Sequence, residues 1–400
     1  MAYDVAAVRA KFPALADGNA YLDGAAGTQT PMSVIDAIGD AYRAGISNLG
    51  GAFPSSVRSG AIVSDCRQAV ADLVGGNPDG VILGPNMTTL TYRLSVVLAK
   101  QWSAGDEIVV SRLDHDANIR PWIQAAERAG VVVRWAEVET DTGELPAAQY
   151  GDLVGPRTKL VALTAASNAI GTRPDVAAIT AAAHAHGALA YIDGVHATPH
   201  GPVDVAALGA DFYATSAYKW TGPHIGAVIA DPGLLETLRP DKLAPSGDEV
   251  PDRFEWGTSA FADLAGVTAA VEHLAGLDPG ATGTRRQRIL TSMAASERHE
   301  QQLFAVLLAG LGALPNVTTY GNARRRAATA YFNLAGRSPG SVAEHLASRG
   351  VNVWNGDNYA YELTTLFGIR SSGSAVRAGL VHYNDRSDVD RLLEGLAELA

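Results

Sequence analysis

The chain is poor in several residue types that other protein classes depend on. Its 400 residues include a single cysteine, Cys66, so we expect no intrachain disulfide, no cysteine-based metal cluster and no metal site. The net charge of -11 disfavours nucleic acid and anionic membranes as partners, because both require a basic surface. No stretch approaches the roughly 20 uninterrupted apolar residues of a membrane-spanning helix, and the first residues lack the apolar core of a signal peptide. These absences predict a cytoplasmic protein that acts on a small molecule.

The pattern of apolar runs predicts an α/β domain over the first two-thirds of the chain. Short strand-like runs alternate with alanine-rich segments that have helical spacing. Apolar strands that alternate with helices indicate a mostly parallel sheet covered on both faces. The predicted strands cover residues 80–86, 107–113, 131–138, 159–167, 188–193, 211–216 and 226–231.

The last third of the chain has a different pattern of expected helices and strands, which predicts a smaller α+β domain. A long helix is expected over residues 285–314, followed by strands at 327–336, 351–357 and 375–384. Asp385 or Ser387 is expected to cap the final helix. With the turn-rich stretch DPGATG as the boundary, the sequence predicts a large domain of residues 18–277 and a small domain of residues 1–17 and 278–400.

Lysine is also scarce, and one of the five lysines stands in an unusual setting. Lys219 follows a predicted strand within DFYATSAYKWTGPH, next to Tyr218 and Trp220. A lysine is normally a hydrated surface residue, and that is the alternative interpretation here. Among aromatic residues and beside a turn, the ammonium group would lose much of its water, which lowers the pKa of a lysine and prepares it for covalent chemistry.

Three other groups follow strands of the same predicted sheet, where ligands of open α/β sheets bind. The run GPNMTT at 84–89 joins a strand to a helix and offers backbone N–H groups to a phosphate, although it also fits a plain helix cap. His115 follows the next strand, and Asp193 ends an apolar strand, where a helix cap is the alternative. A phosphate site, an imidazole, a carboxylate and a poorly hydrated lysine together predict pyridoxal 5'-phosphate. The lysine would form a Schiff base with this cofactor, and the carboxylate would pair with the pyridinium nitrogen.

The chain also resembles class V of the fold-type-I, pyridoxal-phosphate-dependent aminotransferase superfamily, in the branch of cysteine desulfurases and selenocysteine lyases. The resemblance runs nearly end to end. It implies a large domain with a mostly parallel seven-stranded sheet, a smaller α+β C-terminal domain and a homodimer with shared active sites. Its motifs are YLDGAAGTQTP, DHDANIRPW, SNAIGT, GTSAFADLAG, VRAGLVHYNDRSDVDRLLEGL and, most specifically, IDGVHATPHGPVDVAALGADFYATSAYKWTGPHIGA.

Matching positions in these motifs imply roles for individual residues. Lys219 matches the Schiff-base lysine, Asp193 the partner of the pyridine nitrogen, and His115 the histidine stacked on the ring. Arg377 matches the arginine that pairs with the substrate α-carboxylate, a role suited to its planar fork, and Asn118 is also expected to contact the substrate. The remaining cofactor-binding residues implied are Thr88, Thr89, Asn168, His196, Ser216, Tyr218 and, reaching the phosphate of the neighbouring subunit, Thr258.

The chain departs from this pattern at positions that matter for the reaction. His196 stands in place of a glutamine, and Tyr218 in place of a phosphate-binding histidine. The desulfurase nucleophile is missing, because Tyr359 occupies the position of the cysteine that accepts sulfur, in the stretch GDNYA at 356–360. A phenol cannot form a persulfide. Cys66 lies in a predicted helix far from any motif and is interpreted as a packing residue.

The favoured function is therefore a C–S lyase that cleaves cysteine or a cysteine-derived amino acid by β-elimination. Lys219 would remove the α-proton, and Tyr359, His115 or His196 would protonate the departing sulfur. The alternative for Tyr359 is a wall residue. Two other functions stay open, namely a class V aminotransferase or amino-acid epimerase, which share the α-proton step, and a catalytically idle protein that binds the cofactor.

Overall fold

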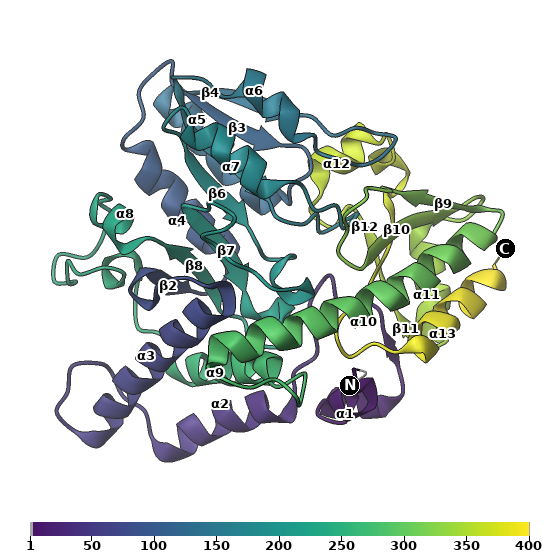
Figure 1. Ribbon diagram of the computed structural model, residues 1–400, viewed down its shortest axis with the longest axis horizontal. Helices are drawn as coiled ribbons and strands as arrows, with labels where there is room; N and C mark the ends of the chain where they lie inside the picture. Colours follow the sequence, from purple (N-terminus) through teal and green to yellow (C-terminus); the bar gives the residue numbers. More distant parts are fainter. Residues whose placement is uncertain (1–2, 400) are drawn as a thin grey trace.

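A seven-stranded sheet forms the centre of the computed structural model, which describes residues 3–399 (Figure 1). The strand order is β2-β8-β7-β6-β5-β3-β4, and every strand runs parallel to the others except β8, which is antiparallel to both of its neighbours. The fold predicted from the sequence is confirmed. The strands are β2 (Val81–Gly84), β3 (Glu107–Ser111), β4 (Val132–Ala136), β5 (Thr158–Thr164), β6 (Leu189–Asp193), β7 (Phe212–Ser216) and β8 (Gly226–Ala230).

Both faces of this sheet are buried at its inner strands, because successive residues of these strands enter two different cores. In β3, Val109 packs into one core, whereas Ile108 and Val110 pack into the other. This explains why the strands are continuously apolar instead of alternating. Helices α4 (Met87–Ala99) and α5 (Arg120–Ala129) cover one face, and the other is covered by α3 (Pro54–Val74), α7 (Val176–His184) and α9 (Phe261–Ala275), with α2 (Met32–Ala44) packed on α9.

A second sheet of four antiparallel strands, in the order β12-β13-β10-β9, lies in the C-terminal third. The long helix α10 (Arg285–Ala313) packs on α9 and α3 at one end and reaches this second sheet at the other (Figure 1). A third core lies between the sheet and its helices. The elements are β9 (Val317–Tyr320), β10 (Thr329–Leu334), α11 (Pro339–Ser348), β12 (Trp354–Gly356), α12 (Tyr361–Leu366), β13 (Ala375–Gly379) and α13 (Arg386–Ala397). The domain boundary at 277/278 stays a prediction.

Two of the strands predicted in this region have different bounds in the structure. The run 351–357 divides into β11 (Val351–Asn352), which pairs with β1 (Ala20–Tyr21), and β12, which pairs with β13. The strand expected over 375–384 ends at Gly379, because the Asn384 side chain accepts a hydrogen bond from the Val381 N–H at 2.8 Å and closes a turn. Local patterns cannot show that one run serves two different partner strands.

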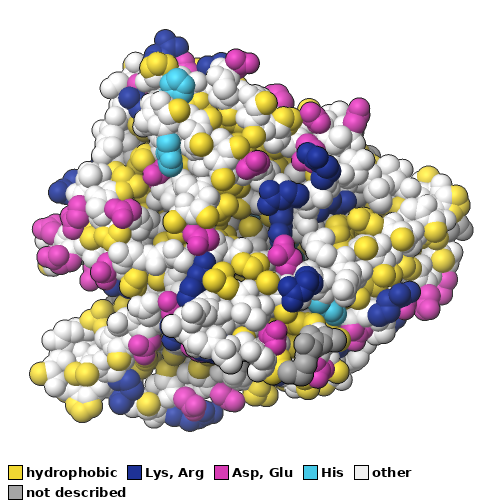
Figure 2. All heavy atoms as spheres, viewed as in Figure 1, with side chains coloured by type: hydrophobic (Ala, Val, Ile, Leu, Met, Phe, Trp, Pro, Cys, Tyr) yellow, Lys and Arg dark blue, Asp and Glu magenta, His cyan; other side chains and the backbone are white. Residues whose placement is uncertain are grey.

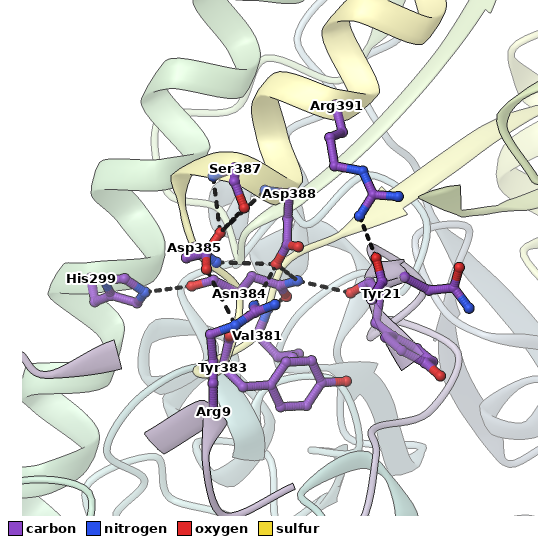
Figure 3. Close-up of polar contacts among 12 residues, drawn as sticks. Arg9, Tyr21, His299, Val381, Tyr383, Asn384, Asp385, Ser387, Asp388 and Arg391 are labelled. Atoms are coloured by element: carbon purple, nitrogen blue, oxygen red, sulfur yellow. Dashed lines mark hydrogen bonds and ion pairs between the residues drawn. The ribbon is translucent and has the colours of Figure 1, made fainter. Parts of the chain in front are cut away.

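The N-terminal segment is attached to the start of α13 by a polar network (Figure 3). Arg9, the last residue of α1 (Val5–Arg9), forms ion pairs with Asp388 at 2.8 Å and with Asp385 at 3.2 Å. The Asn384 amide donates to the Tyr21 carbonyl at 2.9 Å. Asp385, rather than Ser387, is the N-cap, and it forms a capping box with Asp388.

The surface carries charges of both signs. On the face seen in Figure 2, Lys and Arg side chains lie among Asp and Glu side chains. Across the described residues, no helix combines the length and the apolar character that crossing a membrane requires.

We expect Asp388→Asn to lower the free energy of unfolding by about 2–4 kcal/mol, because it leaves the Arg9 charge with a weaker buried partner. The matched control is Asp390→Asn in the same helix, which breaks only the exposed pair with Arg386 and should cost less than about 0.5 kcal/mol. Denaturant-induced unfolding of both variants measures the difference. Equal losses would contradict a special role for the network.

Candidate functional site

The residues that follow the parallel strands line a cavity. The carboxyl ends of β2, β3, β5, β6 and β7 meet at one edge of the sheet, so short segments after them converge there. The lining residues are Met87, Thr88, His115, Thr164, Ala166, Asn168, Asp193, Val195, His196, Tyr218 and Lys219.

Lys219 is buried at the end of a 3-10 turn (Ala217–Lys219) that follows β7. Its amine donates a hydrogen bond to the Ala25 carbonyl and lies 5.3 Å from the centre of the Tyr218 ring. Burial, together with the positive charge of Arg377, lowers the pKa of Lys219 to about 7, and Asp193 opposes this shift. The amine is therefore substantially neutral near pH 7. The contact with Ala25 was not foreseen, since nothing in the local sequence shows that the N-terminal segment passes this lysine.

Asp193 ends β6 and lies wholly within the protein. Its Oδ1 accepts a hydrogen bond from the Val195 N–H at 2.9 Å. Burial raises the pKa of Asp193 to about 6, while the Val195 N–H and Lys219 lower it. The carboxylate caps no helix, because the next helical turn (Thr198–His200) begins after Ala197. A buried carboxyl group with so little compensation needs a partner, and a pyridinium nitrogen supplies one.

The two histidines of the cavity are held neutral. His115 Nδ1 accepts a hydrogen bond from the Ala117 N–H at 3.0 Å, and burial, followed by the charges of Lys219 and Arg377, lowers its pKa to about 3. His196 Nε2 lies 2.9 Å from the Thr329 hydroxyl, and burial holds its pKa well below the usual range.

Two buried polar atoms of lining residues have no hydrogen-bond partner among the described residues. They are His196 Nδ1 and Asn168 Oδ1, whereas the Asn168 amide nitrogen donates to the Asn358 carbonyl at 2.7 Å. Buried polar atoms are nearly always paired in folded proteins. Their presence in the lining fits a polar ligand such as pyridoxal phosphate.

The N-terminus of α4 supplies one wall of the cavity. Asn86 caps the helix by accepting from the Thr89 N–H at 2.8 Å, and Ser216 Oγ accepts from the Met87 N–H at 3.1 Å. Thr88 lines the cavity directly. The helix-cap interpretation of this segment is confirmed by the bond to Asn86, and the phosphate site stays a prediction.

A second, outer cavity of about 450 Å³ adjoins the first and shares His115, Asn168, Tyr218 and Lys219 with it. Arg377 is buried on its wall and donates to the Asn168 carbonyl at 2.8 Å. Burial lowers the pKa of Arg377 to about 10, so it stays charged. The other lining residues are Ala26 and the run from Trp354 to Tyr359.

Several residues considered in the sequence analysis line neither cavity, namely Thr89, Ser216, Asn118, Thr258 and Cys66. Asn118 is buried, with its amide nitrogen donating to Asp114 at 2.7 Å and its oxygen accepting from Trp122 at 2.9 Å, so its polar groups are already paired away from the substrate space. Thr258 lines a separate cavity beside Trp256. Cys66 is fully buried in α3, and burial raises the pKa of its thiol.

Comparison with known proteins agrees with this arrangement. Residues 20–392 match the aminotransferase class-V family. The whole chain is 37% identical to an uncharacterised protein of Mycobacterium tuberculosis and 34% identical to a cysteine desulfurase of Klebsiella pneumoniae, covering 100% and 99% of those proteins. It superposes on the crystal structure of the cysteine desulfurase CsdA of Escherichia coli with a TM-score of 0.86 and 27% identity, over 100% of this chain and 98% of that one. The chain belongs to the class-V aminotransferase family, in its cysteine desulfurase-like branch, and its cofactor is pyridoxal phosphate.

The lowered pKa of Lys219 makes cofactor capture depend on pH. Only a neutral amine attacks the aldehyde carbon of pyridoxal phosphate. The rate at which cofactor-free protein takes up the cofactor should therefore rise with pH to a midpoint near 7, instead of near 10.4 as for an ordinary lysine. Stopped-flow absorbance at pH values on either side of 7 measures this rate.

Arg377→Leu is the informative variant for the cause of this shift, since it removes a positive charge that lowers the pKa of Lys219. Its midpoint should move to higher pH. An unchanged midpoint would show that burial alone sets the pKa.

Proposed function

We propose that this protein is a C–S lyase that uses pyridoxal phosphate to cleave a cysteine-derived amino acid by β-elimination. The observation that carries the proposal is the lining of the two joined cavities, which offers an amine, a carboxylate, a guanidinium and a phenol but no thiol. The single cysteine of the chain is buried in α3. Sulfur transfer through a protein persulfide therefore has no nucleophile, whereas elimination needs none.

Different residues are expected to bind the cofactor and the substrate. Lys219, Asp193, His115, His196 and Asn168 surround the space for the cofactor ring. Pyridoxal phosphate, when bound, supplies the electron sink that makes an α-proton acidic. Around its phosphate the candidates are Thr88, Thr89, Ser216 and Tyr218. Arg377, buried on the wall shared with Lys219, is positioned to pair with the substrate carboxylate.

The elimination needs one base and one acid. Lys219, with its pKa near neutrality, takes the proton from Cα. The Cβ–S bond then breaks with its electron pair on sulfur, which must gain a proton. Because burial holds His115 and His196 in the neutral form, neither carries the extra proton of an imidazolium, and the Tyr359 hydroxyl remains the candidate acid. The products are a thiol and an enamine that water converts to pyruvate and ammonia.

Product analysis tests the reaction. Protein loaded with pyridoxal phosphate should convert cysteine, cystine or S-substituted cysteines to pyruvate, and Lys219→Ala should lower the rate by at least about 10³-fold. Pyruvate and alanine are assayed in parallel. Alanine with released sulfide would mean desulfuration without the usual cysteine. Consumption of a keto acid would mean transamination, and deuterium exchange at Cα without turnover would mean epimerisation.

We further propose that the protein works as a homodimer with shared active sites. Large apolar side chains are exposed along α2, α3 and the loop between them, namely Ile35, Tyr42, Leu49, Phe53 and Val57. Exposed apolar surface of this extent favours a protein partner. Thr258 is exposed outside the cofactor cavity of its own chain, which suits a contact with the phosphate site of a second copy.

Light scattering should give twice the mass of the chain. Thr258→Ala should weaken pyridoxal phosphate binding by roughly tenfold, the loss of one hydrogen bond to a charged group, while Ser259→Ala in the same segment should not. A monomer with full cofactor affinity in Thr258→Ala would overturn the proposal of shared sites.

A further inference from the structure

The outer cavity is larger than the side chain of cysteine requires. It has a volume of about 450 Å³ and extends from Lys219 and Arg377 to Trp354 and Tyr359. This volume is within the range of pockets that bind whole small organic molecules. If Arg377 holds the α-carboxylate and Lys219 reaches Cα, a free thiol would occupy only the innermost part.

The outer wall of this cavity presents two aromatic side chains. Trp354 is 52% exposed and Tyr359 is 70% exposed, although both line a concave surface. Trp354 lies opposite Arg377 in the pairing of β12 with β13, and the Tyr359 ring stacks on His115 with the ring centres 5.2 Å apart. His115 covers part of the Tyr359 ring, and the surface of both rings that stays exposed in the cavity favours an apolar or aromatic ligand group.

The loop that carries Tyr359 is held in a strained conformation. Asn358 and Tyr359 have φ angles of 52° and 60°, the left-handed region that residues other than glycine rarely adopt. Two hydrogen bonds hold them there, from the Asp116 N–H to the Tyr359 carbonyl at 2.8 Å and from Asn168 to the Asn358 carbonyl at 2.7 Å. Strain of this kind persists only where the surroundings impose it, and it gathers at ligand-binding sites.

An ionic cluster fastens the other end of the loop. Glu362, in the first turn of α12, bridges Arg112, at 2.9 Å, and Arg120, both of which follow strand β3 of the large sheet. The Arg370 guanidinium lies 4.0 Å from the centre of the Tyr361 ring. The backbone that carries Tyr359 is thus held on both sides, which lowers the entropy lost when a ligand contacts it.

We infer that Trp354 and Tyr359 form a preformed receptor for the sulfur substituent, so that the substrate is a cysteine S-conjugate with an apolar or aromatic group and not free cysteine. This inference rests on the proposed function, since it assigns the substrate class of the same site. Arg377 and Lys219 would hold the amino-acid part, and the substituent would lie between the two rings.

The test compares S-benzylcysteine with cysteine on protein loaded with pyridoxal phosphate. Wild-type protein should have a kcat/KM for S-benzylcysteine at least about tenfold higher. Trp354→Ala and Tyr359→Ala should each lower that ratio by roughly tenfold, mainly through a higher KM. Trp354→Phe and Tyr359→Phe are the matched controls, because they keep an aromatic surface and should keep most of the ratio.

The variants Tyr359→Phe and Tyr359→Ala also separate the two proposed roles of Tyr359, as the acid and as part of the receptor. If the phenol is the acid, Tyr359→Phe slows both substrates and leaves their ratio unchanged, whereas Tyr359→Ala also changes the ratio. A ratio that stays the same in Trp354→Ala and Tyr359→Ala, or a wild-type preference for free cysteine, would overturn the inference while leaving the lyase activity intact.

A binding measurement keeps the inference testable if no substrate is cleaved. S-benzylcysteine and alanine are titrated against the cofactor absorbance of the loaded protein. Tighter binding of S-benzylcysteine that is lost in Trp354→Ala supports the receptor and overturns only the proposed reaction. Equal affinities for the two ligands overturn the receptor.

Discussion

The burial of the Lys219 amine is the constraint around which the site is arranged. A buried ammonium group needs compensation, and here the Ala25 carbonyl, the Tyr218 ring and the Asp193 carboxylate offset part of its loss of water. Arg377, buried on the wall of the outer cavity, adds a second positive charge that makes a protonated lysine less favourable. The amine therefore loses its proton near neutral pH, which supports the proposed roles of Lys219 in holding an aldehyde and accepting a proton from carbon.

The topology of the sheet determines which groups surround that amine. Because six of the seven strands run parallel, their carboxyl ends meet at one edge, and residues separated by more than a hundred positions become neighbours. The inner strands are buried on both faces, and three candidate polar groups lie at or after their carboxyl ends. His115 follows β3, Asn168 follows β5 and Asp193 ends β6. Burial at this edge of the sheet keeps His115 neutral by lowering its pKa. It also raises the pKa of Asp193 to about 6.

The site is completed by segments from the C-terminal third, which gives this chain its individual chemistry. β13 supplies Arg377, and the loop between β12 and α12 supplies Tyr359, which we expect at the position of the desulfurase nucleophile. Glu362 forms ion pairs with Arg112 and Arg120 and so ties α12 to the segment after β3. A phenol on this loop supports the proposed elimination, in which sulfur leaves the substrate directly.

The sequence by itself determined the α/β fold, the positions of the seven strands to within a few residues, and a set of candidate residues for the site. These follow from local patterns, since apolar runs, turn residues and the rarity of lysine and cysteine are readable without a partner segment. Only the tertiary structure decided the contact of Ala25 with Lys219, the pairing of Thr329 with His196, the withdrawal of Asn118 into bonds with Asp114 and Trp122, and the division of residues 351–357 between two sheets. Each of these depends on which distant segment lies alongside. That choice is made by packing across the whole chain, and no local pattern carries it.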